Sequence, residues 1–247
     1  MTEKNERVVT SQRITLRVSD GTEMPAYVAR PVGDASRGIL VYQEAFGVNH
    51  HIRDVADRFA REGYVAIAPA LYHRTDPEFE GSYTDFGNVM PHMQAITEDN
   101  LTADIRAASA WLTSAEGANT DRTVAVGYCL GGRVAFQTVI VAPVRAAACY
   151  YGGGIAPNPA RNMPGLLEQV GALHAPVLLV WGGKDAHMGP DVTRAVDDAL
   201  IAANKTHASI TFSDADHGFF CDARASYNPD AARQAWALTL AFFESYL

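Results

Sequence analysis

Three residues that could together perform covalent acyl chemistry occur in order along the chain: Cys129, Asp185 and His217. Cys129 is the central residue of Gly127–Gly131 (GYCLG), which follows a short apolar run and precedes a helix-compatible stretch. A strand, a sharp turn and a helix are the context in which a G-x-nucleophile-x-G elbow exposes its nucleophile. We therefore predict that Cys129 is a nucleophile that attacks through sulfur and forms a thioester.

The flanking glycines distinguish this cysteine from an ordinary buried one. A cysteine at the end of a strand is, by itself, more often a small apolar core residue than a nucleophile. In an elbow, however, the nucleophile has a strained backbone, and the incoming strand packs closely on the outgoing helix. Gly127 and Gly131 provide the room for that packing, and Gly132 is consistent with the same crowding.

Asp185 and His217 are predicted to complete a catalytic triad, because a thiol nucleophile needs a base and the base needs an orienting acid. Each follows an apolar run, 177–181 or 209–212, that we interpret as a strand. Asp185 could instead only cap its turn. The other seven histidines show no HExxH or similar ligand spacing, so no metal site is predicted.

Strand and helix patterns alternate over most of the chain, which predicts a mostly parallel sheet covered by helices on both faces. Alternating stretches at 13–18 and 24–29 flank the turn 19–22 and predict an antiparallel hairpin at the sheet edge. Short apolar runs predict buried strands at 38–42, 65–68, 123–126, 146–151, 177–181 and 209–212. Apolar spacing of three and four predicts helices at 52–61, 100–112, 133–141, 192–203 and 231–246.

Two irregular stretches, 75–87 and 152–165, each follow a predicted strand. Excursions at the carboxyl edge of a parallel sheet are where α/β proteins build binding sites. The length of 247 residues suits one α/β domain spanning 1–247, without a linker or internal repeat.

The composition excludes several classes of function. The formal net charge of -8 and the lack of basic runs argue against a nucleic-acid partner. No apolar stretch of membrane-spanning length occurs, and the polar first ten residues do not resemble a signal peptide. Three cysteines without CxxC spacing suit free thiols in a reducing compartment, so we predict a cytoplasmic protein.

With these residues in place, the sequence resembles the dienelactone hydrolase family of α/β-hydrolases over nearly its whole length. The resemblance implies the α/β-hydrolase fold and a carboxylic ester hydrolase of the carboxymethylenebutenolidase kind. It assigns Cys129 as nucleophile, His217 as general base and then acid, and Asp185 as the carboxylate that orients the imidazole. The segments that carry it are 43–49 (QEAFGVN), 68–72 (APALY), 127–132 (GYCLGG), 181–185 (WGGKD) and 216–219 (DHGF).

The resemblance also implies roles for the loop after the third strand. In this family the glutamate that matches Glu44 lies by the resting thiol and takes part in switching it to thiolate when substrate binds. A carboxylate beside a thiol would hold it protonated, so this role is physically reasonable. The oxyanion hole is expected to comprise the backbone N–H groups of Leu130 and Ala45.

Substrate contacts match the family less well. In the family, two arginines bind a carboxylate of the lactone; the position of one, four residues after the histidine, is Cys221 here. Arg224 is the candidate to replace it, and Arg74 is the basic residue nearest to the other, with a plain surface role as its alternative. Tyr83 and Phe219 are predicted to line the pocket, or else to fill the core.

The leading prediction is a cysteine hydrolase that cleaves a small ester or lactone without any metal or organic cofactor. One alternative is a broader esterase, thioesterase or lactonase for uncharged substrates. Another is a non-catalytic protein of the same fold that binds a ligand or senses oxidation through Cys129. We expect a monomer or a small homo-oligomer with no membrane partner.

Overall fold

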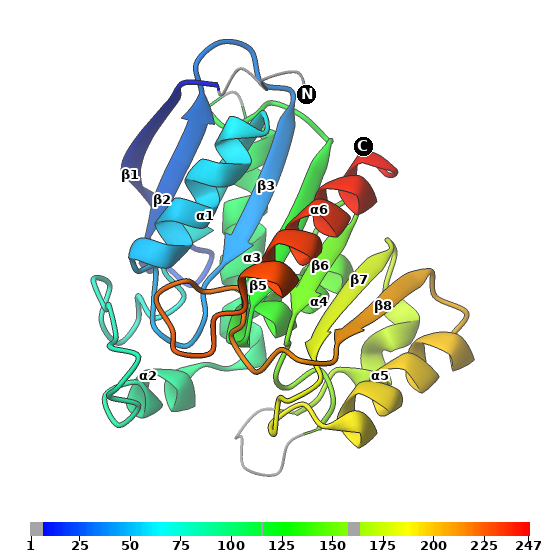
Figure 1. The fold of residues 1–247 in the computed structure, drawn as a ribbon. Helices are drawn as coiled ribbons and strands as arrows, with labels where there is room; N and C mark the ends of the chain where they lie inside the picture. The colour runs from blue at the N-terminus through cyan, green and yellow to red at the C-terminus, as the bar shows by residue number, and fades with distance from the viewer. Residues whose placement is uncertain (1–6, 115, 158–163) are drawn as a thin grey trace.

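The computed structural model describes residues 7–114, 116–157 and 164–247 and arranges them around an eight-stranded sheet (Figure 1). The strand order is β1-β2-β4-β3-β5-β6-β7-β8. β1 pairs antiparallel with β2, β2 pairs antiparallel with β4, and all the other pairs are parallel. The strands are β1 (Val9–Arg17), β2 (Glu23–Pro31), β3 (Arg37–Tyr42), β4 (Tyr64–Pro69), β5 (Thr123–Tyr128), β6 (Ala147–Tyr150), β7 (Val177–Gly182) and β8 (His207–Phe212).

Helices cover both faces of the sheet, as the alternation predicted (Figure 1). α1 and α6 lie on one face, where Phe59 and Phe243 pack in one apolar cluster. α3, α4 and α5 lie on the other, where Ile105, Val134 and Val196 belong to a second cluster. The helices are α1 (His50–Arg61), α2 (Met90–Ala95), α3 (Glu98–Thr113), α4 (Leu130–Val141), α5 (Pro190–Ala202) and α6 (Pro229–Glu244), with a 3₁₀ helix at Leu167–Ala172.

The helices begin two or three residues earlier than the apolar spacing predicted. Asn49, Thr97 and Asn228 are the reason in three of them, because each side chain accepts a hydrogen bond from a backbone N–H of the first turn. Such caps satisfy otherwise unpaired N–H groups, and they are polar, so they carry no apolar period. The six-residue α2 and the 3₁₀ helix were not predicted, since one or two turns are too short to show a period.

The parallel strands direct their carboxyl ends to one edge of the sheet, and the loops after β3, β5, β7 and β8 meet there (Figure 1). The predicted excursion 75–87 follows β4 and leads into α2. Of the second excursion, residues 158–163 lie outside the described residues, as do residues 1–6 of the polar N-terminal stretch. Within the described part of the chain, the helices are all too short or too polar to cross a lipid bilayer.

Candidate active site

Cys129 occupies the sharp turn between β5 and α4. Its backbone has φ 55° and ψ −112°, an unusual conformation for a residue with a side chain. Such a conformation costs about 1–3 kcal/mol and persists where the surroundings enforce it. The residue is 7% exposed, so the thiol is nearly enclosed. This is the geometry predicted for a nucleophile elbow.

The two glycines of the motif are required by close backbone approaches. A Cβ atom on Gly127 would collide with the carbonyl of Gly131, and one on Gly131 would collide with the carbonyl of Tyr42 at the end of β3. The second contact sets the start of α4 directly against the loop after β3. That packing brings the two predicted oxyanion residues to neighbouring loops: Leu130 is the first residue of α4, and Ala45 follows β3. Both are buried.

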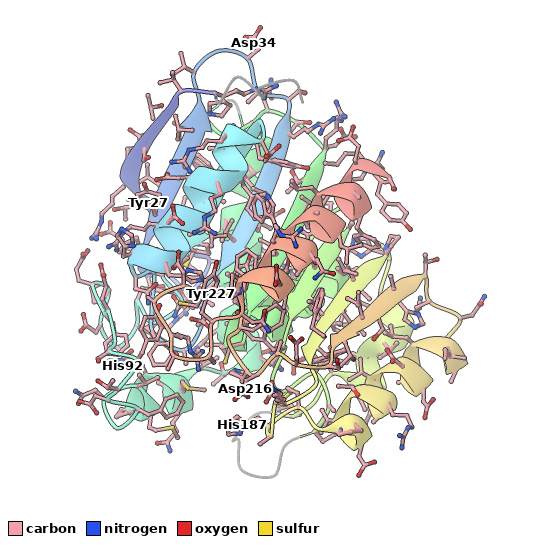
Figure 2. The ribbon with its side chains drawn as sticks, in the orientation of Figure 1. Tyr27, Asp34, His92, His187, Asp216 and Tyr227 are labelled. Carbon is pink, nitrogen blue, oxygen red and sulfur yellow. The ribbon has the colours of Figure 1, made fainter. Side chains whose placement is uncertain are left out.

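His217 and Asp185 form a close pair at the carboxyl ends of β8 and β7. The Nδ1 atom of His217 lies 2.6 Å from Oδ2 of Asp185. The other oxygen of Asp185, Oδ1, accepts hydrogen bonds from the backbone N–H groups of His187 at 2.8 Å and Met188 at 3.1 Å. Figure 2 shows His187 and Asp216, the neighbour of His217, at this end of the sheet. The carboxylate is therefore fixed on both sides and holds the imidazole in one orientation.

The charge state of His217 depends on Cys129. Burial alone would lower the pKa of His217, but the charge of Cys129 and hydrogen bonds to Asp185 and Cys129 outweigh it and raise the pKa to about 10. Burial works to raise the pKa of Asp185, while the hydrogen bond and charge of His217 leave it lowered overall. His217 is therefore held protonated by Asp185 and by the ionised form of Cys129.

Glu44 is a buried carboxylate beside this group. It is 1% exposed, and its Oε1 accepts a hydrogen bond from Arg224 at 3.0 Å. Burial raises the pKa of Glu44, although Arg224 and His217 both act to lower it. Among the described residues, Oε2 of Glu44 has no hydrogen-bond partner. One oxygen is thus held by Arg224, and the other is available.

Arg224 points inward, which the sequence could not establish. Its guanidinium lies 5.6 Å from the ring centre of Phe46 and 5.9 Å from that of Tyr83. It also lies against Gly218, where a Cβ atom would collide with it and where φ is +75°. Arg224 is therefore placed next to His217 as well as Glu44, in a setting that could receive an anionic group.

The predicted aromatic contacts occupy different environments. Tyr83 is partly exposed, and its hydroxyl accepts hydrogen bonds from Asn49 at 2.9 Å and from the Cys221 thiol at 3.2 Å. Phe219 is fully buried and packs on Tyr151, with ring centres 5.5 Å apart. Tyr83 is thus available to a ligand, whereas Phe219 supports the loop that carries His217.

Arg74 is not part of this cluster in the structure. Its guanidinium donates hydrogen bonds to Asp20 at 2.6 Å and to Asp104 at 2.8 Å. Asp104 also contacts the ring of His73 at 3.1 Å. To bind a substrate, Arg74 would have to break a network of two carboxylates, and neither belongs to the elbow or its partners.

A hollow of about 420 Å³, open to solvent, lies beside β2 and the loops that follow β3 and β4. Its lining includes Tyr27, Gln43, Tyr72 and Phe79 but none of the three predicted catalytic residues. Tyr27 is seen well away from His187 and Asp216 in Figure 2. The hollow therefore adjoins the loop that carries Glu44 and Ala45, through Gln43 and Gly47, but is not lined by the predicted triad.

Three residues at the site were not singled out from the sequence. Tyr151 lies 5.0 Å from the ring of His217, Asn49 bonds to Tyr83, and His51 lies with Glu44 and Cys221 in a group of potential metal ligands. Tyr151 follows β6 at the same sheet edge, a signal that could have identified it. Asn49 and His51 gave no such signal, because one caps a helix and the other lies inside it.

Comparison with known proteins shows the relatives of this chain. A model of the dienelactone hydrolase family matches residues 24–247. A protein of Synechocystis sp., named provisionally as a carboxymethylenebutenolidase, is 35% identical over 234 residues, which cover 91% of this chain and 93% of that protein. One of Salmonella typhimurium, with the same provisional name, is 34% identical over 245 residues, 96% of this chain and 88% of that one.

Solved structures agree with these relatives. The crystal structure of a provisionally assigned dienelactone hydrolase from Klebsiella pneumoniae superposes with a TM-score of 0.86 and 33% identity, covering 97% of this chain and all of that one. The structure of an esterase of Pyrococcus furiosus superposes with a TM-score of 0.71 and 13% identity. The match covers 95% of this chain and 90% of the esterase chain. The second likeness concerns the fold alone.

Proposed function

Because this chain belongs to the dienelactone hydrolase family, has the α/β-hydrolase fold and is a carboxylic ester hydrolase, we propose that it cleaves its substrate through a thioester on Cys129. The observation that carries this proposal is the contact of a strained, enclosed Cys129 with His217, which Asp185 holds at 2.6 Å. Sulfur is the nucleophile because it lies at the elbow position between Gly127 and Gly131.

The first half-reaction forms the acyl-enzyme. The Cys129 thiolate attacks the carbonyl carbon of an ester or lactone, and a C–S bond forms as the carbonyl oxygen becomes an oxyanion. The backbone N–H groups of Leu130 and Ala45 stabilise that oxyanion, each being worth about 2.7–4 kcal/mol in comparable enzymes. The C–O bond then breaks, and the imidazolium of His217 gives its proton to the departing alkoxide.

The second half-reaction releases the acid. Neutral His217 takes a proton from water, and the resulting hydroxide attacks the thioester carbon. Collapse expels the Cys129 thiolate, and His217 is again an imidazolium beside it. Asp185 keeps Nδ1 of the ring occupied throughout, so the other nitrogen faces the reacting groups.

We further propose that Arg224 recognises a carboxylate of the substrate. The provisional name of the relatives, carboxymethylenebutenolidase, describes hydrolysis of a lactone that carries such a group. Arg224 already binds one carboxylate, Glu44, at 3.0 Å. A substrate carboxylate would compete for the guanidinium and free Glu44, which could then act on the thiol as the family resemblance implies.

A second candidate is hydrolysis of small uncharged esters, thioesters or lactones. It is favoured by the existing pairing of Arg224 with Glu44, which leaves the arginine neutralised, and by the aromatic rings of Phe46 and Tyr83 beside it. Both candidates share the small-molecule substrate and the Cys129 chemistry.

Three free, buried cysteines also support our proposal that the enzyme works in the reducing cytoplasm.

The test compares wild-type protein with Cys129→Ala on a chromogenic short-chain ester and on a cis-dienelactone. We expect turnover by wild type and a loss of about 10⁴-fold or more in kcat for the variant, since nucleophile loss has effects of this size or larger. Acid quenching followed by intact-mass measurement should show the acyl group on wild type and not on the variant. Equal turnover by the two proteins would refute the nucleophile assignment, and no turnover by wild type would favour a non-catalytic role.

A further inference from the structure

Three buried side chains that can bind metals meet beside the active site. Glu44 comes from the loop after β3, His51 from the first turn of α1, and Cys221 from the loop after β8. One carboxylate oxygen, one ring nitrogen and the sulfur all lie within 4.8 Å of one another. The residues are 1%, 2% and 0% exposed, respectively. Segments far apart in the sequence therefore converge on one enclosed point.

Three polar atoms of this group are left without hydrogen-bond partners. Both ring nitrogens of His51 and Oε2 of Glu44 are buried and have no hydrogen-bond partner among the described residues. The nearest acid to His51 is Asp222, whose Oδ1 lies 3.8 Å from Nδ1, beyond hydrogen-bond range. A buried unsatisfied polar group costs about 1–3 kcal/mol, so one that persists calls for an explanation.

The imidazole of His51 is also held in place by its neighbours. Its ring meets those of Tyr128 and Phe220 edge-on, with both pairs of ring centres 6.2 Å apart. Cys221 is oriented by its contact with the hydroxyl of Tyr83 at 3.2 Å. A second layer of contacts that fixes the ligands is typical of metal sites in proteins.

We propose that Glu44, His51 and Cys221 bind a zinc ion. Zinc takes sulfur at about 2.3 Å and nitrogen or oxygen at about 2.0–2.2 Å, which for tetrahedral angles places the ligand atoms roughly 3.3–3.6 Å apart. Side-chain shifts of about 1 Å would close the present separations to these values. A thiolate and an imidazole in the donor set favour zinc over magnesium or calcium, which prefer oxygen alone.

The charges and protons of the site balance. The Cys221 S–H bond breaks, its proton leaves to water, and an S–Zn bond forms, so two anionic ligands face the dication. Arg224 can remain on Oε1 of Glu44 while Oε2 turns to the metal. The Tyr83 hydroxyl, which accepts from the thiol, would then donate to the thiolate.

Zinc at this point inhibits hydrolysis, a consequence that rests on the role of Glu44 proposed above. Bound to the metal, the carboxylate of Glu44 could neither exchange its partner Arg224 nor approach the thiol of Cys129. The binding itself rests on geometry alone. The two parts are therefore measured separately.

Binding is tested in Cys129→Ala protein, which removes the other thiol–imidazole pair that zinc could occupy. Calorimetric titration of metal-free protein with zinc chloride should give one ion per chain. The further change Cys221→Ser, or His51→Asn, should weaken that binding about 100-fold or more, since even indirect partners of a metal site are worth about 10–100-fold. His50→Asn and Cys149→Ala are the matched controls, an exposed neighbour and another buried thiol, and should bind as before.

A cobalt(II) titration supplies a second readout, the absorption spectrum of the bound metal, which reports directly on ligation by a thiolate. A thiolate-to-cobalt absorption band in Cys129→Ala that is missing in Cys129→Ala/Cys221→Ser supports the site. Binding that survives Cys221→Ser, or that disappears in Cys129→Ala alone, overturns it. If zinc binds as expected and the wild-type enzyme is not inhibited in a chelator-reversible way, the inhibitory consequence is wrong while the site stands.

Discussion

Two buried histidine–aspartate pairs lie within the described part of the chain, and they differ in what surrounds the histidine. His217 contacts Asp185 at 2.6 Å, and His73 contacts Asp104 at 3.1 Å. The aspartates are equally buried, with side chains 0% and 1% exposed. The side chain of His217 is 13% exposed, however, whereas that of His73 is wholly enclosed.

The surroundings show why a histidine–aspartate pair alone is no active site. The ring of His217 has the Cys129 side chain as its second partner. Among the described residues, the Asp185 carboxylate contacts only that ring and the backbone N–H groups of His187 and Met188. Asp104 is instead shared with the Arg74 guanidinium, which neutralises it, and Nδ1 of His73 has no partner within the described part of the chain. We propose that the first pair moves a proton, whereas the second joins the end of β4 to α3.

The largest expected effect separates the two histidines. His217→Asn should lower kcat by about 10⁴-fold, as loss of a triad base does, and should also lower the free energy of unfolding by about 1–3 kcal/mol, because the buried hydrogen bond to Asp185 is lost. His73→Asn should lower the free energy of unfolding by about 1–3 kcal/mol, because a buried hydrogen bond is lost, and leave kcat unchanged. Ester hydrolysis and urea denaturation of both variants measure the difference. Equal losses of kcat at equal folded fractions would remove the distinction between the pairs.

The two arginines sharpen the same comparison. Arg224→Ala should raise KM for a carboxylate-bearing lactone about 10- to 100-fold relative to a neutral ester, since a charged hydrogen bond is worth about 1.5–3 kcal/mol. Taking the ratio of the KM values for the two substrates cancels any general effect of leaving Glu44 buried and unpaired. Arg74→Ala should lower the melting temperature and leave that ratio at the wild-type value. A shifted ratio in Arg74→Ala would return Arg74 to the list of substrate contacts.

The smallest effect concerns pH. The pKa of His217 is raised to about 10, so the imidazolium is kept at neutral pH and is lost as pH rises through that value. Because the imidazolium protonates the leaving group, kcat/KM should fall above pH 10. In Cys129→Ala the charge that raises the pKa is absent, so the pKa should move down toward the ordinary 6.5. The pH dependence of ester hydrolysis measures the fall in kcat/KM, and titration of labelled histidine by NMR measures the pKa of His217 in the two proteins. Identical pKa values in the two proteins would contradict the coupling between Cys129 and His217.

Much of the architecture could be predicted from local pattern. The hairpin, the parallel strands and the five long helices follow from apolar spacing, and each is present. The prediction that 209–212 is a buried strand was wrong, because β8 lies at the edge of the sheet and only its Phe212 is buried. The early helix starts at Asn49, Thr97 and Asn228 were missed because capping is a polar signal. α2 was missed because six residues are too few to show a period.

Within the site, the residues that directly follow a strand could be predicted from the sequence, whereas those in irregular loops could not. Asp185 and His217 were expected to meet because β7 and β8 run parallel and end at one edge, and they do. Arg224 lies in an irregular loop, where no repeat indicates direction, so its contact with Glu44 came only with the structure. Arg74 was expected nearer the substrate and lies instead with Asp20 and Asp104.

The sequence by itself determined the order of elements and the elbow at Cys129, because apolar periodicity and obligatory glycines are local properties of the chain. Tertiary structure alone decided which of two arginines contacts Glu44, and that Glu44, His51 and Cys221 converge. Those outcomes depend on how loops separated by many residues pack together, and packing distances between them have no local signature in the chain.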